Sequence, residues 1–368
     1  MLRGVAITLV LLLHYSLTYR LSASPLADWF GADTVRALVN QGNYGVTMFF
    51  VVSGYLITTN ALRRHGTLAA IDVRAFYRMR AARILPPLLL ALTIIVVLGC
   101  LGLRSFANTD NQQPLPASYF VIAVGSVLTF THNLLMQSAG YFNYCLNIYW
   151  SLSVEEVFYL GFPVLCVGAG RNAIVVLACA ALIVAGPLYR SVHAEDELYF
   201  MYGYIACFDA IAMGVLAALL AHRMAPPPAA VARWLIAPAA AALAWAYWRG
   251  IGGHEVFGFT QVAAAAAVLL YLASAGAGSG LAATRGFAPL RWAGRHSYEL
   301  YLFHIVVLGL MRDAVPRNQL GYAAKLPWLA VFIVLSAVAA SLVARYLSEP
   351  ANAALRRGGG QLQPRSVS

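Results

Sequence analysis

The feature that most constrains this chain is a repeated pattern of long apolar segments along its 368 residues. A helix needs about 20 predominantly apolar residues to cross the hydrocarbon core of a bilayer. Eleven segments reach or approach that length: 4–22, 43–61, 84–103, 117–136, 149–169, 172–192, 201–221, 234–250, 259–277, 297–314 and 327–346. Charged residues make up only 11% of the chain, against about 25% in an average soluble domain. The sequence therefore predicts an all-α fold, a polytopic integral membrane helical bundle.

The placement of basic residues predicts how the segments cross the membrane. Arginine and lysine favour the cytoplasmic side. If all eleven segments crossed, the basic stretches 222–233 and 285–295 would lie outside, against that preference. The segment 117–136 contains the polar stretch TFTHN at 129–133, so we expect it to be a re-entrant or peripheral segment. About ten transmembrane helices then remain, and both termini are expected in the cytoplasm.

Charge and composition also limit the domain organisation and the kinds of partner that we expect for the chain. We divide it into a transmembrane domain over 1–350 and a cytoplasmic tail over 351–368, which begins as an amphipathic stub and ends in disorder. The formal net charge is +11, and Lys325 is the only lysine. A basic chain can indicate nucleic-acid binding, but no soluble basic domain is present, so we expect no nucleic-acid partner. The five cysteines show neither a CxxC motif nor a metal-ligand spacing, so we expect them to be small apolar packing residues and expect no metal.

The first apolar segment carries an arginine and a histidine in a regular relation. Eleven helical steps of about 100° place Arg3 and His14 on the same helix face, about 16 Å apart along the axis. With a cytoplasmic N-terminus, Arg3 lies at the interface and His14 near the middle of the membrane. An ionisable residue at that depth indicates a functional site, although a neutral histidine bonded between helices is the alternative. His14 suits a general base, and Arg3 suits an anionic group.

A second group of arginines precedes the third apolar segment. Arg78, Arg80 and Arg83 come just before the sequence ILPPLLL, in which Pro86 and Pro87 suit the first turn of a helix. Arginines at a helix N-terminus form an anion site together with the backbone N–H groups. The alternative is ordinary positive charge on the cytoplasmic side.

Glu155, Glu156 and Asp209 are acidic residues inside apolar segments. Glu155 and Glu156 are adjacent in the stretch YWSLSVEEVFYL, about a turn inside the outer end of their segment. Adjacent helical residues point about 100° apart, so we expect at most one of these two carboxylates to face a given cavity. Asp209 lies in the middle of its segment, where an acid needs a partner, and a structural ion pair and a role in the site are both open.

The remaining candidates are histidine, glutamate, tyrosine and small residues. The stretch HSYELYLFHI places Glu299 and His304 in one segment. Tyrosines in and near the apolar segments either line a site with hydroxyl groups or are interfacial aromatics; they are Tyr141, Tyr298 and Tyr301. In FFVVSGYLI, the small residues Ser53 and Gly54 favour close helix packing.

Six stretches, taken together and in order, resemble the membrane acyltransferase-3 family over nearly the whole chain. They are LRGVAITLVLLLH with its R-x10-H spacing, FFVVSGYLI, FYRMRAARILP with RxxR at Arg80 and Arg83, WSLSVEEVFY, SYELYLFH and YLSEP. The chain departs from the family's usual LDGLRG start and has a methionine where a further arginine is common in FYRMR. It is also expected to lack the hydrolase-like domain that many relatives carry outside the membrane.

The resemblance implies a bacterial inner-membrane enzyme that moves an acyl group, usually acetyl, from cytoplasmic acyl-CoA to a hydroxyl of a carbohydrate. It implies that His14 is catalytic and that Arg3, Arg80 and Arg83 bind the donor or maintain the site. We prefer a general base to an acyl-histidine intermediate, because the base needs fewer steps. Glu155 or Glu156 would orient His14 or the acceptor.

We expect five further residues to bind substrate: Trp150, Ser151, Asp209, Tyr298 and His304. The expected co-substrate is acetyl-CoA, and the expected partners are a surface or exported glycan and membrane lipid. A transporter or flippase for glycans or acylated substrates is the alternative function. No inverted repeat of the kind many transporters show is visible in the sequence.

Overall fold

The computed structural model describes residues 1–357 except 111–112, 225–226, 277–279 and 281–282, and residues 358–368 lie outside the described part. The first half contains α1 (Leu2–Tyr19), α2 (Pro25–Phe30), α3 (Ala32–Val39), α4 (Asn43–His65), α5 (Val73–Cys100), β1 (Thr109–Asp110), β2 (Gln113–Pro114), α6 (Tyr119–Leu128), α7 (His132–Ala139) and α8 (Trp150–Ala169). The second half contains α9 (Asn172–Val192), α10 (Glu197–Phe200), α11 (Tyr204–Arg223), α12 (Ala229–Arg249), α13 (Gly258–Ser274), α15 (Ala288–Arg295), α16 (Ser297–Ala314), α17 (Lys325–Val343) and α18 (Glu349–Arg357). A π-helix at Ala344–Ser348 joins α17 to α18, and 3-10 turns lie at Leu21–Ala23, Leu68–Ala70, Arg104–Phe106, Asn147–Tyr149 and Arg285–Phe287.

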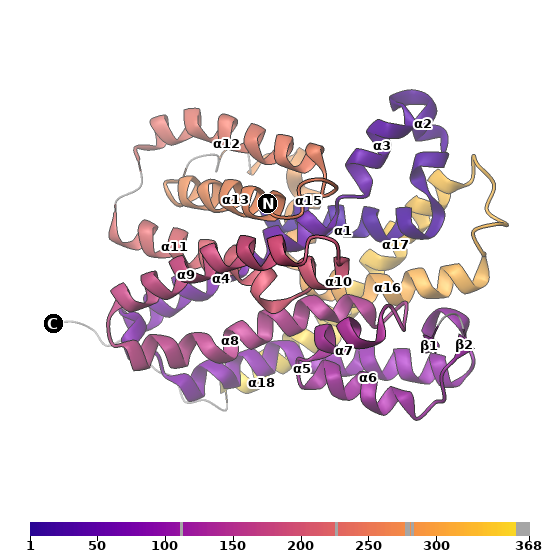
Figure 1. Ribbon diagram of the computed structural model, residues 1–368, viewed down its shortest axis with the longest axis horizontal. Helices are drawn as coiled ribbons and strands as arrows, with labels where there is room; N and C mark the ends of the chain where they lie inside the picture. The colour runs from indigo at the N-terminus through magenta and orange to yellow at the C-terminus, as the bar shows by residue number, and fades with distance from the viewer. Residues whose placement is uncertain (111–112, 225–226, 277–279, 281–282, 358–368) are drawn as a thin grey trace.

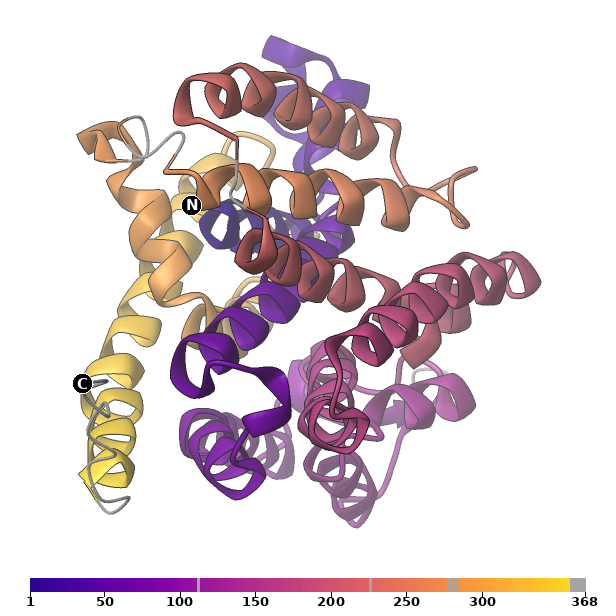
Figure 2. The same cartoon turned by 90° about the vertical axis from the view of Figure 1, so that its left-hand side faces the viewer.

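The arrangement is an all-α polytopic membrane bundle, as predicted. Many of the long helices run side by side along the long axis of the molecule, and the strand pair lies at one end (Figure 1). The view turned by 90° shows α12 along the top edge and the yellow α17–α18 run along the left edge (Figure 2). Among the described residues, eight helical stretches are long and apolar enough to cross a membrane: Leu2–Tyr19, Ala32–His65, Val73–Cys100, Asn147–Ala169, Asn172–Val192, Glu197–Arg223, Ala229–Arg249 and Lys325–Ala354.

Two further segments that the sequence predicted to cross form helices that are not among these eight candidate spans. The apolar helix α13 has 17 residues, and α16 has 18 but carries Glu299, Arg312 and Asp313. The segment 117–136, expected not to cross, is broken into the short helices α6 and α7, with a left-handed residue, Phe130, between them. At about 1.5 Å per residue, a ten-residue helix such as α6 spans about 15 Å, half of the hydrocarbon core.

Helix α5 begins earlier than the apolar pattern predicted. The Asp72 carboxylate accepts a hydrogen bond of 2.8 Å from the Ala75 backbone N–H, which caps a helix that starts at Val73. Pro86 and Pro87 therefore lie inside the helix, and the prediction that they occupy its first turn was wrong. The arginines that precede them are within a helix, so the N–H groups of a helix N-terminus do not contribute to their site.

Close contact between α4 and α11 forms the centre of the bundle. Gly54 leaves no room for a Cβ atom beside the backbone oxygen of Ile211, and Gly214 leaves none beside that of Val51. The two glycines allow the helix backbones to touch, because any side chain would collide with main chain that cannot move aside. The close packing predicted at Gly54 is confirmed.

The C-terminal part of the chain is helical as far as the structure describes it. Helix α18 extends from Glu349 to Arg357 and packs against α5. The predicted boundary between residues 350 and 351 lies inside this helix. The expected disorder concerns residues 358–368, which lie outside the described residues.

Candidate active site

A cavity of about 390 Å³ lies among α1, α4, α5, α8 and α16. Its wall combines apolar side chains with charged and hydroxyl-bearing ones; the polar members include Arg3, Ser53, Arg80, Arg83, Glu155, Glu156, Tyr159, Tyr298 and Tyr301. Along α4 the lining runs from Val46 to His65, which corresponds to about 29 Å at 1.5 Å per residue. The cavity is therefore long and narrow relative to its volume.

One end of this cavity is rich in arginine. Arg63 and Arg64 in the last turn of α4 and Arg78 and Arg83 in α5 line it, and all four are exposed. Six arginines and two glutamates line the cavity in all, so its charge is strongly positive. The exposed arginines can hold an anionic group, because guanidinium groups bind phosphate and carboxylate in a bidentate manner.

Arg80 lies deeper and already has a partner. Its Nη2 lies 3.3 Å from Oε1 of Glu156, and its guanidinium carbon lies 3.4 Å from the centroid of the Tyr159 ring. The side chains of Arg80 and Glu156 are 23% and 9% exposed, and Nε of Arg80 is buried without a hydrogen-bond partner in the described structure. The two arginines of the RxxR pattern therefore differ, since Arg83 has no ion pair among the described residues.

Glu155 lines the same cavity through a different set of contacts. Ser53 donates a hydrogen bond to Oε1 of Glu155 and also contacts the Tyr159 hydroxyl, which lies 3.5 Å from the same Glu155 oxygen. The expectation that at most one of Glu155 and Glu156 would face a cavity was wrong. Both side chains line the cavity but have different partners: Glu155 bonds to Ser53 on α4, and Glu156 bonds to Arg80 on α5.

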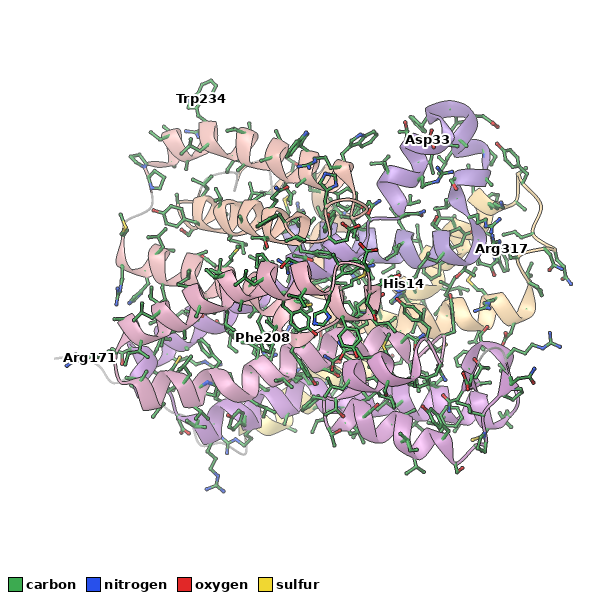
Figure 3. The ribbon with its side chains drawn as sticks, viewed as in Figure 1. His14, Asp33, Arg171, Phe208, Trp234 and Arg317 are labelled. Carbon is green, nitrogen blue, oxygen red and sulfur yellow. The ribbon has the colours of Figure 1, made fainter. Side chains whose placement is uncertain are left out.

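His14 pairs with the second intramembrane histidine, His304. His304 Nε2 lies 3.1 Å from His14 Nδ1, and the ring centroids are 5.0 Å apart. His14 is partly buried and His304 is fully buried. In Figure 3, His14 lies between Arg171, near the left end of the molecule, and Arg317, near the right end. Neither histidine is among the residues that line the cavity.

Tyr301 connects the cavity to the histidine pair. It lines the cavity, and its ring centroid lies 5.9 Å from that of His304. The Tyr301 hydroxyl donates to the Ile148 carbonyl at 2.9 Å and lies 2.6 Å from the Ser151 hydroxyl, which holds the ring in place. Arg3 lines the cavity from α1. The same helix therefore carries an arginine in the cavity wall and His14, the partner of His304.

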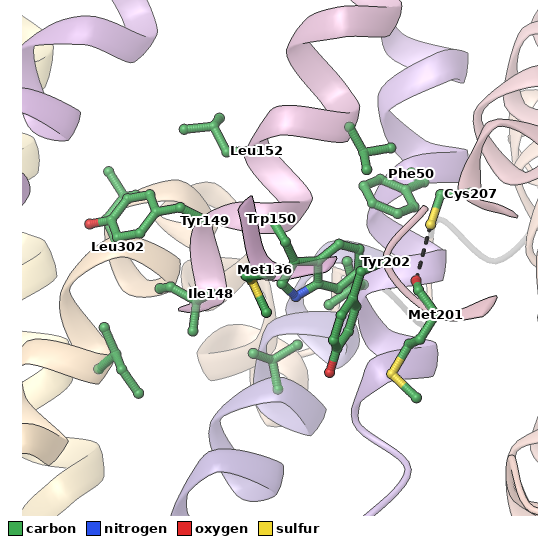
Figure 4. Packing of buried hydrophobic residues seen from close by; sticks show 14 of the residues in the cluster. Phe50, Met136, Ile148, Tyr149, Trp150, Leu152, Met201, Tyr202, Cys207 and Leu302 are labelled. Atoms are coloured by element: carbon green, nitrogen blue, oxygen red, sulfur yellow. Dashed lines mark hydrogen bonds between the residues drawn. The ribbon is translucent and has the colours of Figure 1, made fainter. Parts of the chain in front are cut away.

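The other predicted substrate-binding residues divide between cavity and core. Ser151 and Tyr298 line the cavity, and the Tyr298 hydroxyl donates to the Ile84 carbonyl at 3.0 Å. Trp150 packs against Phe50 and Tyr202 in the hydrophobic core, outside the cavity lining (Figure 4). The structure therefore gives Trp150 a packing environment.

Asp209 lies in a sealed ion pair away from the cavity. Its Oδ2 accepts a hydrogen bond of 2.7 Å from Nη2 of Arg190 and one of 2.8 Å from Thr260. The side chains of Arg190 and Asp209 are 0% and 1% exposed. Arg190, in the last turn of α9, therefore lies inside the bundle.

Sequence reasoning missed Tyr159 and gave Ser53 only a packing role. Tyr159 follows Glu155 by four residues and Glu156 by three, so helical spacing places it beside both carboxylates. That spacing was a usable signal. The role of Ser53 had no such signal, because its partners lie on another helix.

Comparison with known proteins is consistent with this geometry. The family model described as an acyltransferase domain matches residues 1–346. O-acetyltransferase OatA of Staphylococcus aureus (strain NCTC 8325 / PS 47) is 23% identical over 332 residues, covering 85% of this chain and 53% of that protein. The putative O-acetyltransferase SACOL0978 of Staphylococcus aureus (strain COL) is 32% identical over 127 residues, covering 34% of this chain and 20% of that protein.

The chain thus spans about half the length of the OatA proteins it matches, and no solved structure matches it. The family match covers almost all of the helical bundle, including α1, α4, α5, α8 and α16; of the residues that line the cavity, Asn352 on α18 lies beyond it. On this evidence the chain is a membrane protein of the acyltransferase-3 family.

Proposed function

We propose that this protein is an O-acyltransferase that moves an acyl group, most simply acetyl, from acyl-CoA to a hydroxyl of a surface or exported carbohydrate. The observation that carries the proposal is the cavity itself. Exposed arginines stand at one end, and Tyr301, which contacts the histidine pair, stands in its wall. Family membership and the names of the O-acetyltransferase relatives support the reaction class.

The arginine-rich end suits the nucleotide of the donor. The phosphates of acyl-CoA would bind Arg63, Arg64, Arg78 and Arg83, which line this end and are exposed. The pantetheine arm would then extend along α4 into the cavity, which is long enough for a flexible chain and partly apolar. Arg3 and the Arg80–Glu156 pair would contact that arm or keep the cavity in shape.

His14 would act as the general base near the inner end of the donor. As the acceptor oxygen attacks the thioester carbonyl, its proton moves to His14, the C–O bond forms and the carbonyl oxygen takes the negative charge. Collapse of this intermediate breaks the C–S bond. The thiolate leaves with the electron pair and takes the proton from His14, which returns the enzyme to its starting state.

The donor end would face the cytoplasm of a bacterium, with the protein in the inner membrane and both termini inside. This orientation follows from the arginine distribution and from the location of acyl-CoA in the cell. Single cysteines at Thr67 and at Ser138, both exposed positions, would test it in a Cys100→Ala background. A membrane-impermeant thiol reagent added to whole cells should label Ser138→Cys and not Thr67→Cys, and the reverse pattern would refute the orientation.

Transfer of label from radioactive acetyl-CoA tests the reaction. Membranes containing the wild-type protein should place label in the cell's polysaccharide, and His14→Ala should abolish it while the protein still inserts and folds. His222→Ala, at an exposed position on α11, is the matched control and should transfer normally. Normal activity in His14→Ala would end the catalytic role. A wild-type protein that transfers nothing from a panel of acyl-CoA donors, yet moves glycan across vesicles, would be the transporter instead.

A further inference from the structure

His304 is held by the backbone of its own helix. Its Nδ1 lies 3.0 Å from the carbonyl oxygen of Leu300 and 2.8 Å from that of Tyr301. Carbonyl oxygens only accept hydrogen bonds, so Nδ1 must carry a proton to avoid facing two lone pairs. In a neutral imidazole the other nitrogen, Nε2, is then the acceptor. Because His304 is fully buried with no carboxylate bonded to it among the described residues, the neutral form is the one that fits the site.

The same reasoning fixes the proton on His14. Its Nδ1 lies 3.1 Å from Nε2 of His304 and 3.0 Å from the carbonyl oxygen of Val10. Both neighbours are acceptors, so His14 Nδ1 carries the proton and donates. Nε2 of His14 is left unprotonated, and no described residue forms a hydrogen bond with it. Nε2 is therefore the nitrogen that is free to take a proton from an incoming hydroxyl.

We infer that His304 is a positioning residue, which together with the Val10 carbonyl fixes the tautomer and the ring orientation of His14 so that Nε2 is the base. The inference rests on the proposed function for its catalytic consequence, but the tautomer itself is a property of the resting protein. His304 has the place that an acid residue has in a nucleophile–histidine–acid triad, where the third group orients the histidine. A neutral acceptor orients the ring without adding a second charge to the interior of the bundle.

The pair also determines where the transferred proton can go. When His14 takes a proton at Nε2, its ring becomes a cation and the Nδ1–H bond to His304 strengthens. His304 cannot pass that proton further, because its own Nδ1–H already faces two backbone carbonyls. The proton stays on His14 until the leaving thiolate collects it, so the two steps of the transfer use one nitrogen.

The tautomer can be measured without any assay of activity. Full-length protein labelled with 15N-histidine in lipid nanodiscs distinguishes protonated from unprotonated ring nitrogens, and His14→Gln identifies the His14 signals. We expect Nδ1–H in the wild type. In His304→Leu the Val10 carbonyl is the one described acceptor left beside Nδ1, so we expect a mixture of tautomers with a measurable share of Nε2–H. His132→Leu is the control, because His132 is equally buried but contacts Ser126 and has no contact with His14. A wild-type His14 protonated at Nε2, or a tautomer unchanged in His304→Leu, would overturn the inference.

Kinetics of the same variants test the consequence for acyl transfer. Loss of the correct tautomer costs about 10⁴-fold in kcat where the orienting group is charged, and we expect about 100-fold for a neutral one. His304→Leu should therefore lower kcat about 100-fold and change the KM for acyl-CoA by less than about twofold. His304→Gln, whose amide oxygen can accept from Nδ1 of His14, should recover most of the rate. Equal kcat in His304→Leu and wild type would refute the positioning role. Absence of transfer in the wild type would refute only the proposed function, since the NMR result stands by itself.

Discussion

The molecule contains two arginine–carboxylate pairs inside the bundle, and they are built differently. In the pair of Arg190 and Asp209, the guanidinium bonds to the carboxylate, to the Thr260 hydroxyl and to the carbonyl oxygens of Ala206 and Val256. Arg80 makes one hydrogen bond to Glu156 at 3.3 Å, and its Nε has no partner in the described structure. The first pair is sealed, and the second lines a cavity.

The difference separates a structural charge from one available to a ligand. A buried pair is tolerated when its donors and acceptors are satisfied, and Arg190 joins α9 to α11, α13 and the loop before α13 in this way. An incompletely bonded arginine beside open space retains donors that a substrate can use. Sequence patterns treat Asp209 and Glu156 alike, because both are acids within apolar helices.

Breaking the sealed pair should have the largest effect. Arg190→Met leaves Asp209 charged and buried without its partner, which typically costs about 3–5 kcal/mol of the free energy of unfolding. Thermal unfolding in detergent should show this loss, and the double variant Arg190→Met/Asp209→Leu should recover most of it. Arg36→Met is the control, since its pair with Asp33 is exposed on the surface. If Arg190→Met unfolded at the wild-type temperature, the pair would have no structural role.

Breaking the open pair should reduce transfer and leave stability nearly intact. In Glu156→Gln, Arg80 loses the charge that holds it over the Tyr159 ring, and loss of a charge-assisted hydrogen bond of this kind corresponds to about 10-fold to about 100-fold in rate. The cavity can hydrate the arginine, so the unfolding temperature should stay close to that of the wild type. Glu195→Gln, at an exposed position, serves as the control. A large fall in unfolding temperature with normal transfer per folded molecule would make the two pairs equivalent.

An arginine with no carboxylate partner should give the smallest effect. Arg83→Ala removes one exposed cation from the cavity, so we expect the KM for acyl-CoA to rise about 3-fold to about 10-fold with kcat unchanged, less so at high salt. Steady-state kinetics at two ionic strengths would measure this. Arg74→Ala, on the same helix but outside the cavity lining, should leave the KM unchanged. Equal KM values in Arg83→Ala and wild type would show that Arg83 does not bind the donor and serves only as a positive charge that sets the membrane topology.

Several features of the site could be predicted because they are local to one helix. The spacing of Arg3 and His14 predicted that they share one face of α1. In the structure Arg3 lines the cavity and His14 pairs with His304. Glu155 and Glu156 were visible as acids in an apolar segment. The start of α5 was missed because a capping aspartate, and not the apolar pattern, decides where that helix begins.

The sequence by itself determined that this chain is a bundle of membrane helices with a few charged and histidine residues inside it. Hydrophobicity and helical periodicity are properties of neighbouring residues, so they can be read directly from the chain. Only the tertiary structure decided which buried groups meet: His14 with His304, 290 positions away, Arg80 with Glu156, 76 away, and Asp209 with Arg190. Those pairings depend on which helices pack together and at what rotation, and the same composition permits many such arrangements.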